Sequence, residues 1–141
     1  MTRSYICIWI HTVWATKHRE PLLAKKWRIA FFQKMRQIAE EKAYKLDFIN
    51  GVEDHLHCLF SLKATQNIAQ IMKNIKGASS YWLNEQGYIE GKFSWQEGYY
   101  AASVSPDRVP TIRNYIRNQE EHHRFNSLDN ELEYFEKFED I

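Results

Sequence analysis

Two periods of hydrophobic and polar positions alternate along the chain and divide it into predicted strands and helices. Residues 5–16 are aromatic and β-branched on both faces, which predicts a central strand covered on both sides. Residues 25–44 carry apolar side chains at helical spacing, which predicts an amphipathic helix. Residues 45–52 and 55–62 are short apolar runs separated by acidic residues, and they predict an antiparallel strand pair.

The second half of the chain returns to helix and strand. Thr65 is the predicted N-cap of a second helix with a buried apolar side. The run "FSWQEGYYAASVS" at residues 93–105 follows as a strand with a glycine break at Gly98. A third helix is predicted to run through His123, and a terminal helix that includes Leu132 follows it.

The predicted order is strand, helix, strand, strand, helix, strand, helix. Its first six elements match the split β-α-β motif of ferredoxin-like folds. We therefore predict an α+β protein with a ferredoxin-like antiparallel sheet, helices on one face, and a C-terminal tyrosine-bearing helix and tail as additions. This arrangement would leave the other sheet face open for a ligand or partner. No repeat or linker divides the sequence, so residues 1–141 form one predicted domain.

Composition narrows the class of protein. The 141 residues are 44% hydrophobic and 15% aromatic, which indicates a globular domain with its own core. The net charge of +1 hides an uneven distribution, because acidic residues concentrate in residues 129–141 and leave a basic body. A basic body is compatible with a nucleic acid partner without requiring one.

The cysteines and the N-terminus indicate where the protein works. Cys7 and Cys58 lie in apolar strand-like runs without the spacing of a zinc site, which predicts buried, reduced thiols. The apolar run at the N-terminus is too short to span a bilayer and has no small-residue cleavage site. We expect a cytoplasmic protein with no membrane partner.

His55 and His57 stand out in the otherwise apolar run "HLHCLF". Residues two apart on a strand point to the same face, so the two imidazoles share one face while Leu56 and Cys58 share the other. A pair of same-facing imidazoles is either hydrogen-bonded structural histidine or part of a metal site. The spacing alone leaves both interpretations open.

Tyr115 and Gln119 are candidates for further functional groups beside the face that carries His55 and His57. They are four residues apart, so a continuous helix would place them on one side, with His122 and His123 one turn later. Taken alone, such a pair is typical of a helix surface. Beside the His pair, an amide oxygen and two imidazoles would form an incomplete shell around a divalent cation, open to phosphate oxygens and water. The phenolic oxygen of Tyr115 would then be the attacking group.

Four segments in order, "HTVWATKHR", "HLH", "SWQEGYYAASVS" and "YIRNQEEHH", carry a family resemblance. Together they resemble the HUH single-tyrosine transposases of small bacterial insertion sequences, including those associated with repetitive extragenic palindromes (REPs). The resemblance covers nearly the whole chain.

The resemblance implies a role for each matching residue. His55 and His57 match the metal ligands, Gln119 matches the third ligand, and Tyr115 matches the nucleophile that becomes joined to the 5′ phosphate of cleaved single-stranded DNA. It further implies magnesium or manganese as cofactor, DNA hairpins as substrate and a homodimer. We therefore expect a transposase that cleaves and rejoins single-stranded DNA at hairpin-marked sites through a phosphotyrosine intermediate.

Basic side chains are candidates for contacts with DNA phosphates. Lys17 and Arg19 lie in a basic turn, and Lys73 and Lys76 lie in the second predicted helix. A solvated surface is the competing interpretation of all four residues.

Other polar residues near the motifs have open roles. His11 is predicted as a packed core histidine rather than a ligand. Asp54 either orients the neighbouring imidazole or is an ordinary turn residue. The roles of His122 and His123 do not follow from their spacing.

Two other functions are compatible with the same residues. One is a domesticated HUH endonuclease that acts on chromosomal palindromes. The other is a non-catalytic module that binds single-stranded nucleic acid on its open sheet face. That module would leave the His pair and the Tyr-x-x-x-Gln spacing unexplained.

Overall fold

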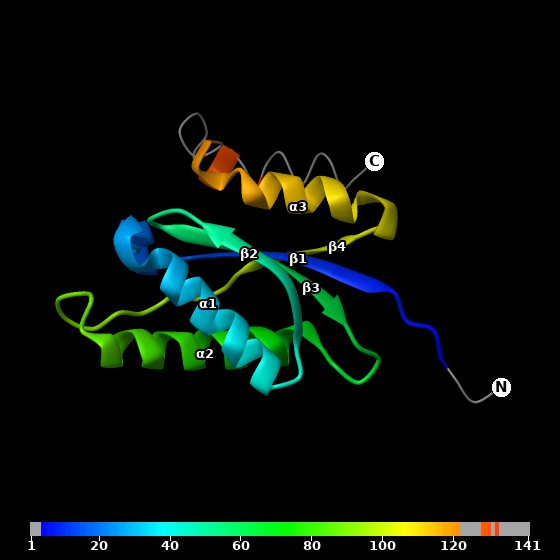
Figure 1. Cartoon of the computed structure of the whole chain (residues 1–141), viewed down its shortest axis with the longest axis horizontal. Coiled ribbons are helices and arrows are strands. Elements are labelled where there is room, and N and C mark those ends of the chain that lie inside the picture. The colour runs from blue at the N-terminus through cyan, green and yellow to red at the C-terminus, as the bar shows by residue number, and fades with distance from the viewer. Residues whose placement is uncertain (1–3, 122–127, 131, 133–141) are drawn as a thin grey trace.

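Antiparallel strands form the centre of the computed structural model, which describes residues 4–121, 128–130 and 132 (Figure 1). The strands in the described part of the chain are β1 (Ile8–Ala15), β2 (Lys45–Gly51), β3 (His55–Leu62) and β4 (Tyr100–Val104), in the order β2-β3-β1-β4. All neighbouring pairs are antiparallel. The strand pair predicted on either side of the two acidic residues is confirmed.

Helices lie on both sides of this sheet. The α-helices are α1 (Lys25–Glu41), α2 (Ile68–Gln86) and α3 (Val109–Arg117), and the 3-10 turns are η1 (Lys17–Arg19) and η2 (Pro106–Arg108). α1 and α2 cover one face and α3 lies over the other (Figure 1). The ferredoxin-like sheet with an additional tyrosine-bearing helix is confirmed. None of the helices in the described residues is long and apolar enough to cross a membrane.

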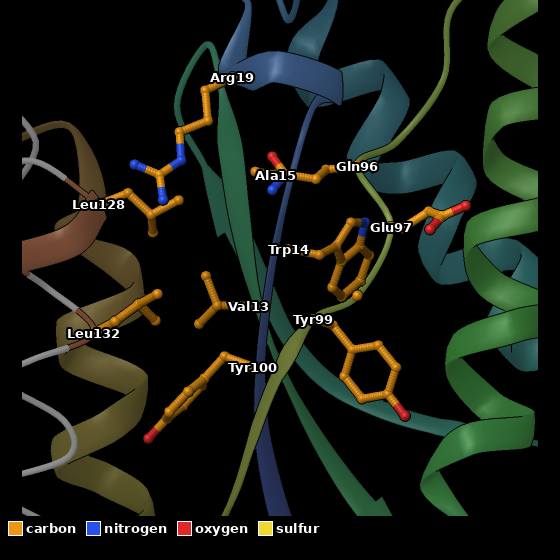
Figure 2. A pocket seen from close by; sticks show the side chains of 11 residues that line it. Val13, Trp14, Ala15, Arg19, Gln96, Glu97, Tyr99, Tyr100, Leu128 and Leu132 are labelled. Carbon is orange, nitrogen blue, oxygen red and sulfur yellow. The ribbon is translucent and has the colours of Figure 1, made fainter.

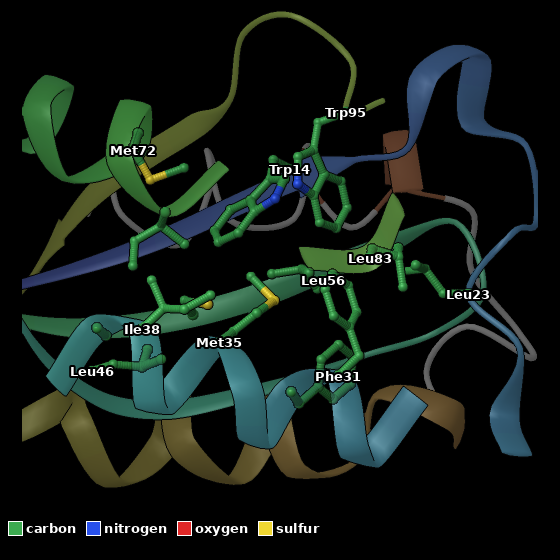
Figure 3. Close-up of a cluster of buried hydrophobic side chains, with 14 of the residues drawn as sticks. Trp14, Leu23, Phe31, Met35, Ile38, Leu46, Leu56, Met72, Leu83 and Trp95 are labelled. Atoms are coloured by element: carbon green, nitrogen blue, oxygen red, sulfur yellow. The ribbon is translucent and has the colours of Figure 1, made fainter. Parts of the chain in front are cut away.

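The main core lies between the sheet and the helices α1 and α2. Figure 3 shows Trp14 and Leu56 from the strands packed against Phe31 and Met35 of α1 and Met72 of α2. These sheet residues alternate with the ones that face α3, as the two-residue period of a strand requires. The helical spacing of apolar residues in α1 and α2 therefore predicted their buried sides correctly.

The face predicted to be open is covered. Leu59 and Val104 of the sheet are buried against Val109, Ile112 and Ile116 of α3. A short helix with three buried apolar side chains gains free energy by packing on a sheet face that carries apolar groups of its own. His55 and His57 therefore lie beneath a helix instead of on an exposed surface.

One of the two cysteines is not where the sequence predicted. Cys58 is buried in the core, and burial raises the pKa of its thiol well above the ordinary value. Cys7 is exposed. The reason is the strand register: pairing of β1 with β3 begins at Ile8, opposite Leu62, so Cys7 precedes the paired part of the sheet.

The third helix is shorter than predicted. α3 ends at Arg117, residue 118 forms a turn, and residues 119–121 are helical again. The side-chain amide of Asn50 in β2 binds the carbonyl oxygens of Ile116 and Arg117, at 3.0 and 3.1 Å. These carbonyls are therefore bonded to a side chain where a continuing helix would bond them to its own N–H groups. The predicted end at His123 lies outside the described residues, as does most of the predicted terminal helix.

The predicted strand at residues 93–105 consists of two parts. Trp95 forms an isolated bridge with Thr16, and β4 starts only at Tyr100. Gly98 lies between them with a φ of 81°, a left-handed conformation that favours glycine. The predicted glycine break is therefore present.

The cap of α2 also differs from the prediction. The residue before the helix is Asn67, and its side-chain oxygen accepts a hydrogen bond from the backbone N–H of Gln70 at 2.8 Å. Thr65 lies two residues too early for this role. Its exposed side chain makes no capping bond to α2 in the described structure.

Replacing Asn67 with Ala is expected to lower the free energy of unfolding by about 1 kcal/mol, because the amide of Gln70 loses its capping acceptor. Thr65→Ala is the matched control and should change it by less than about 0.5 kcal/mol. Urea unfolding followed by circular dichroism measures both. Equal losses in the two variants would contradict the assignment of Asn67 as the cap.

Candidate active site

Three histidines lie together on the sheet face beneath α3. His55 and His57 come from β3, and His11 comes from the adjacent strand β1. The register pairs Ala15 with His55 and Val13 with His57, which places His11 diagonally beside His57. All three histidine side chains are fully buried. The same-face arrangement predicted for His55 and His57 is therefore present.

Asp54 contacts the imidazole of His55. The Nδ1 atom of His55 lies 2.7 Å from Oδ1 of Asp54. The backbone of Asp54 is itself held, because its carbonyl oxygen accepts hydrogen bonds from the N–H and the hydroxyl of Thr16, at 2.9 and 3.2 Å. A carboxylate that accepts the Nδ1 proton fixes the tautomer in which Nε2 carries the lone pair. Of the two interpretations of Asp54, the structure supports the orienting one.

His11 contacts the second imidazole in a similar way. Its Nε2 atom lies 2.9 Å from Nδ1 of His57, and the two rings are stacked with centroids 5.1 Å apart. The ring of Tyr100 meets His11 edge-on at 6.0 Å. His11 is thus a buried histidine, as predicted, and it also orients His57. Sequence alone could not find this contact, because it depends on the register between β1 and β3.

Tyr115 reaches this face from α3. Its half-buried ring lies 5.9 Å from the ring of His57, measured between centroids. α3 is fastened to β2 by the guanidinium of Arg113, which donates to both carboxylate oxygens of Asp47 at 2.6 and 2.8 Å. This bidentate pair raises the pKa of Arg113. The predicted nucleophile therefore lies beside one of the predicted ligands.

Gln119 is fully buried, and its amide lacks partners. Neither its Oε1 nor its Nε2 atom has a hydrogen-bond partner in the described structure. A buried amide without hydrogen bonds costs free energy, so such a group in a folded protein requires an explanation. A ligand that binds the amide oxygen would provide one.

Acidic and cysteine side chains do not complete a metal site here. Among the residues that the structure describes, no group of three or more His, Cys, Asp or Glu side chains is placed to hold a metal ion. The ligand set predicted from the sequence is His55, His57 and Gln119. It contains only two residues of the His, Cys, Asp or Glu types, so this absence does not contradict it.

Lys17 and Arg19, the predicted DNA contacts of the basic turn, lie in η1 at the end of β1. Lys17 is exposed. The guanidinium of Arg19 donates to Oδ1 of Asp129 at 2.7 Å, and this contact holds the pKa of Asp129 below its ordinary value. A phosphate that bound Arg19 would have to compete with Asp129.

Lys73 and Lys76 lie on α2, which covers the opposite face of the sheet from the histidines. Lys73 is exposed, whereas the ammonium of Lys76 donates to the carbonyl oxygens of Gln96 and Gly98 at 2.8 and 3.0 Å. Partial burial lowers the pKa of Lys76. Lys76 therefore anchors the loop before β4 in this structure.

A pocket of about 280 Å³ lies beside the end of β1 and is lined by the loop before β4, by Leu128 and by Leu132 (Figure 2). Leu128 and Leu132 face Val13 across it, and Tyr100 forms one wall. Arg19 lies at its rim. The pocket adjoins the active-site face, because Val13 is the register partner of His57.

His122 and His123, whose roles the sequence left open, lie outside the described residues.

The sequence matches a known family over most of its length. The sequence model of the family described as "Transposase IS200 like" matches residues 4–119. The ISDra2 transposase TnpA of Deinococcus radiodurans is 27% identical over 116 residues, which cover 77% of this chain and 81% of that protein.

Solved structures agree in fold. A crystal structure assigned as a transposase from Deinococcus radiodurans R1 superposes with a TM-score of 0.64 at 25% identity and covers 84% of this chain and 96% of that one. The structure of a REP-associated tyrosine transposase bound to a REP hairpin has a TM-score of 0.58 at 15% identity and covers 84% of this chain and 70% of that one. The resemblance found in the sequence motifs is confirmed, and the chain belongs to the IS200-like transposase family.

Proposed function

We propose that the protein cleaves and rejoins single-stranded DNA at hairpin-marked sites, with Tyr115 as the nucleophile. The observation that carries the proposal is the position of Tyr115 beside His57. The buried amide of Gln119, which has no hydrogen-bond partner in the described part of the chain, supports it. Membership of a transposase family supports DNA as the substrate. The hairpin is supported by a protein of the same fold that was solved bound to one.

The proposal includes a magnesium or manganese ion held by His55, His57 and Gln119. The donor set fits, because both imidazoles use Nδ1 for a contact within the chain and the amide oxygen of Gln119 has no hydrogen-bond partner among the described residues. When bound, the cation would withdraw charge from the non-bridging oxygens of the scissile phosphate. Asp54 and His11 would hold the two imidazoles in the orientation that presents Nε2.

The chemistry of Tyr115 conserves the energy of the DNA bond. The phenolic oxygen attacks phosphorus, a tyrosine–phosphate bond forms, and the bond to the 3′ oxygen breaks. The phenolic proton is released and the departing 3′ oxygen gains a proton, so atoms and charge balance. A 3′-hydroxyl from another DNA end can attack the tyrosine–phosphate bond in the reverse reaction. This joins the strands without a nucleoside triphosphate. A free phenol ionises near pH 10, so the site must favour the phenolate.

DNA contacts and assembly are further parts of the proposal. Lys17 and Arg19 would bind phosphates near the His pair, because their turn follows the strand that carries His11. Lys73 and Lys76 remain predictions for contacts on the opposite side of the sheet. The family resemblance supports a homodimer, and sedimentation of the purified protein would measure the assembly state.

Tyr115→Phe removes the attacking oxygen and keeps the ring that packs near His57. We expect hairpin binding to be unchanged and the covalent protein–DNA adduct to be absent. The measurement uses labelled single-stranded oligonucleotides with manganese or chelator, followed by denaturing gels for adduct and gel shift for binding. Adduct formation by the variant would identify another nucleophile, and loss of hairpin binding would argue against the assigned role.

Gln119→Met replaces the amide with an apolar side chain of similar length. Because the amide has no hydrogen-bond partner in the described structure, we expect the melting temperature of the metal-free protein to stay the same or rise. The rise in melting temperature on adding manganese should shrink, since one ligand is lost.

Gln86→Met, at an exposed position, is the control for the substitution itself and should keep the manganese response of the wild type. Scanning calorimetry with and without manganese measures both variants. A large loss of stability in metal-free Gln119→Met would instead identify the amide as a structural group.

A further inference from the structure

The helix break between the proposed nucleophile and the proposed third ligand has an identifiable cause. α3 ends at Arg117, and residue 118 has a φ of −97° and a ψ of 29°. In an unbroken helix, Tyr115 and Gln119 would share one side because they are four residues apart. The direction of Gln119 is therefore set by whatever terminates the helix and holds the chain after it.

The side chain of Asn50 terminates the helix. Its Nδ2 group donates to the carbonyl oxygens of Ile116 and Arg117, which in a longer helix would accept the N–H groups of the residues four positions later. Asn50 lies directly opposite His57 in the pairing of β2 with β3. One amide thus links the strand that neighbours the proposed ligand to the end of the helix that carries the nucleophile.

An ion pair holds the chain on the other side of Gln119. The carboxylate of Glu120 accepts hydrogen bonds from Arg28 at 3.1 Å and from Lys25 at 3.3 Å. The Arg28 side chain is only 7% exposed and also donates to the carbonyl oxygen of Leu23 at 2.9 Å. A buried guanidinium requires charge compensation, so it favours a position of Glu120 close to the start of α1.

Gln119 therefore lies between two attachment points. Without them, the side chain could relieve the cost of an unpartnered buried amide by turning into water. We infer that Asn50 and the Arg28–Glu120 pair are positioning residues that hold the amide of Gln119 in its buried position, where it would complete the proposed metal site. The inference rests on the proposed function, because it takes Gln119 as a ligand of the manganese or magnesium ion.

The test measures manganese affinity of the full-length protein by electron paramagnetic resonance of free Mn²⁺, without DNA. Glu120→Ala should weaken binding about tenfold, the size of effect typical of groups that orient metal ligands. Glu121→Ala is the matched control, because it removes the same charge from the next residue, which is also exposed. If both variants weakened manganese binding equally, the loss of a nearby negative charge would explain the result, and the inference would be overturned.

Asn50→Ala provides a second, independent variant. It removes the donors to the end of α3 and adds no charge near the histidines, and it should also weaken manganese binding about tenfold. Asn114→Ala, which truncates an exposed asparagine of α3, is the control for a general effect on the helix. Manganese affinity of Asn50→Ala within about twofold of the wild type would overturn the role of Asn50.

A double-mutant cycle separates positioning from a general loss of structure. In the Gln119→Met background, Glu120→Ala should have no further effect on manganese affinity, because it acts only through the amide. An unchanged tenfold effect in that background would show that Glu120 acts elsewhere.

The cycle also distinguishes this inference from the proposed function. If wild type binds manganese and Gln119→Met weakens it while the Asn50 and Glu120 variants do not, only the inference fails. If Gln119→Met binds manganese as tightly as wild type, the proposed third ligand fails and the inference fails with it.

Discussion

The pairing of β1 with β3 is the constraint on which the rest of the site depends. It buries a strand with two histidines in the middle of the sheet and places His11 beside His57. Side chains alternate between faces, so a shift of one residue in β3 would turn both histidines of that strand into the apolar core under α1 and α2. The apolar side chains of Leu56 and Cys58, which fill that core, prevent this shift.

Burying polar groups between the sheet and α3 costs free energy. Hydrogen bonds within the chain offset this cost for some of these groups and not for others. The imidazoles of His55 and His57 each have a buried or half-buried polar neighbour, in Asp54 and His11. The amide of Gln119 has no hydrogen-bond partner in the described residues. Hydrogen bonds within the described chain thus hold the histidines of the strands but not the amide that follows α3, and the proposed metal ion would bind that amide.

The two sides of the site differ in how they are held. The histidines belong to a sheet with backbone hydrogen bonds on both sides of their strand, whereas Tyr115 belongs to a nine-residue helix. That helix depends on a small apolar cluster and on polar contacts with β2, among them the Arg113–Asp47 pair. Short helices have little stability of their own, so the position of Tyr115, the proposed nucleophile, depends on these tertiary contacts.

The sequence by itself determined the features that follow from local periodicity. The two-residue period placed His55 and His57 on one face, the helical period identified the buried sides of α1 and α2, and the ordered motifs identified the family. Features that depend on distant segments were decided only in the tertiary structure. Asn50 ends α3 before the predicted residue, and α3 covers the face that was expected to be open. His11 meets His57 across a sequence separation of 46 positions, and no local pattern encodes such a contact because it arises from strand register and packing.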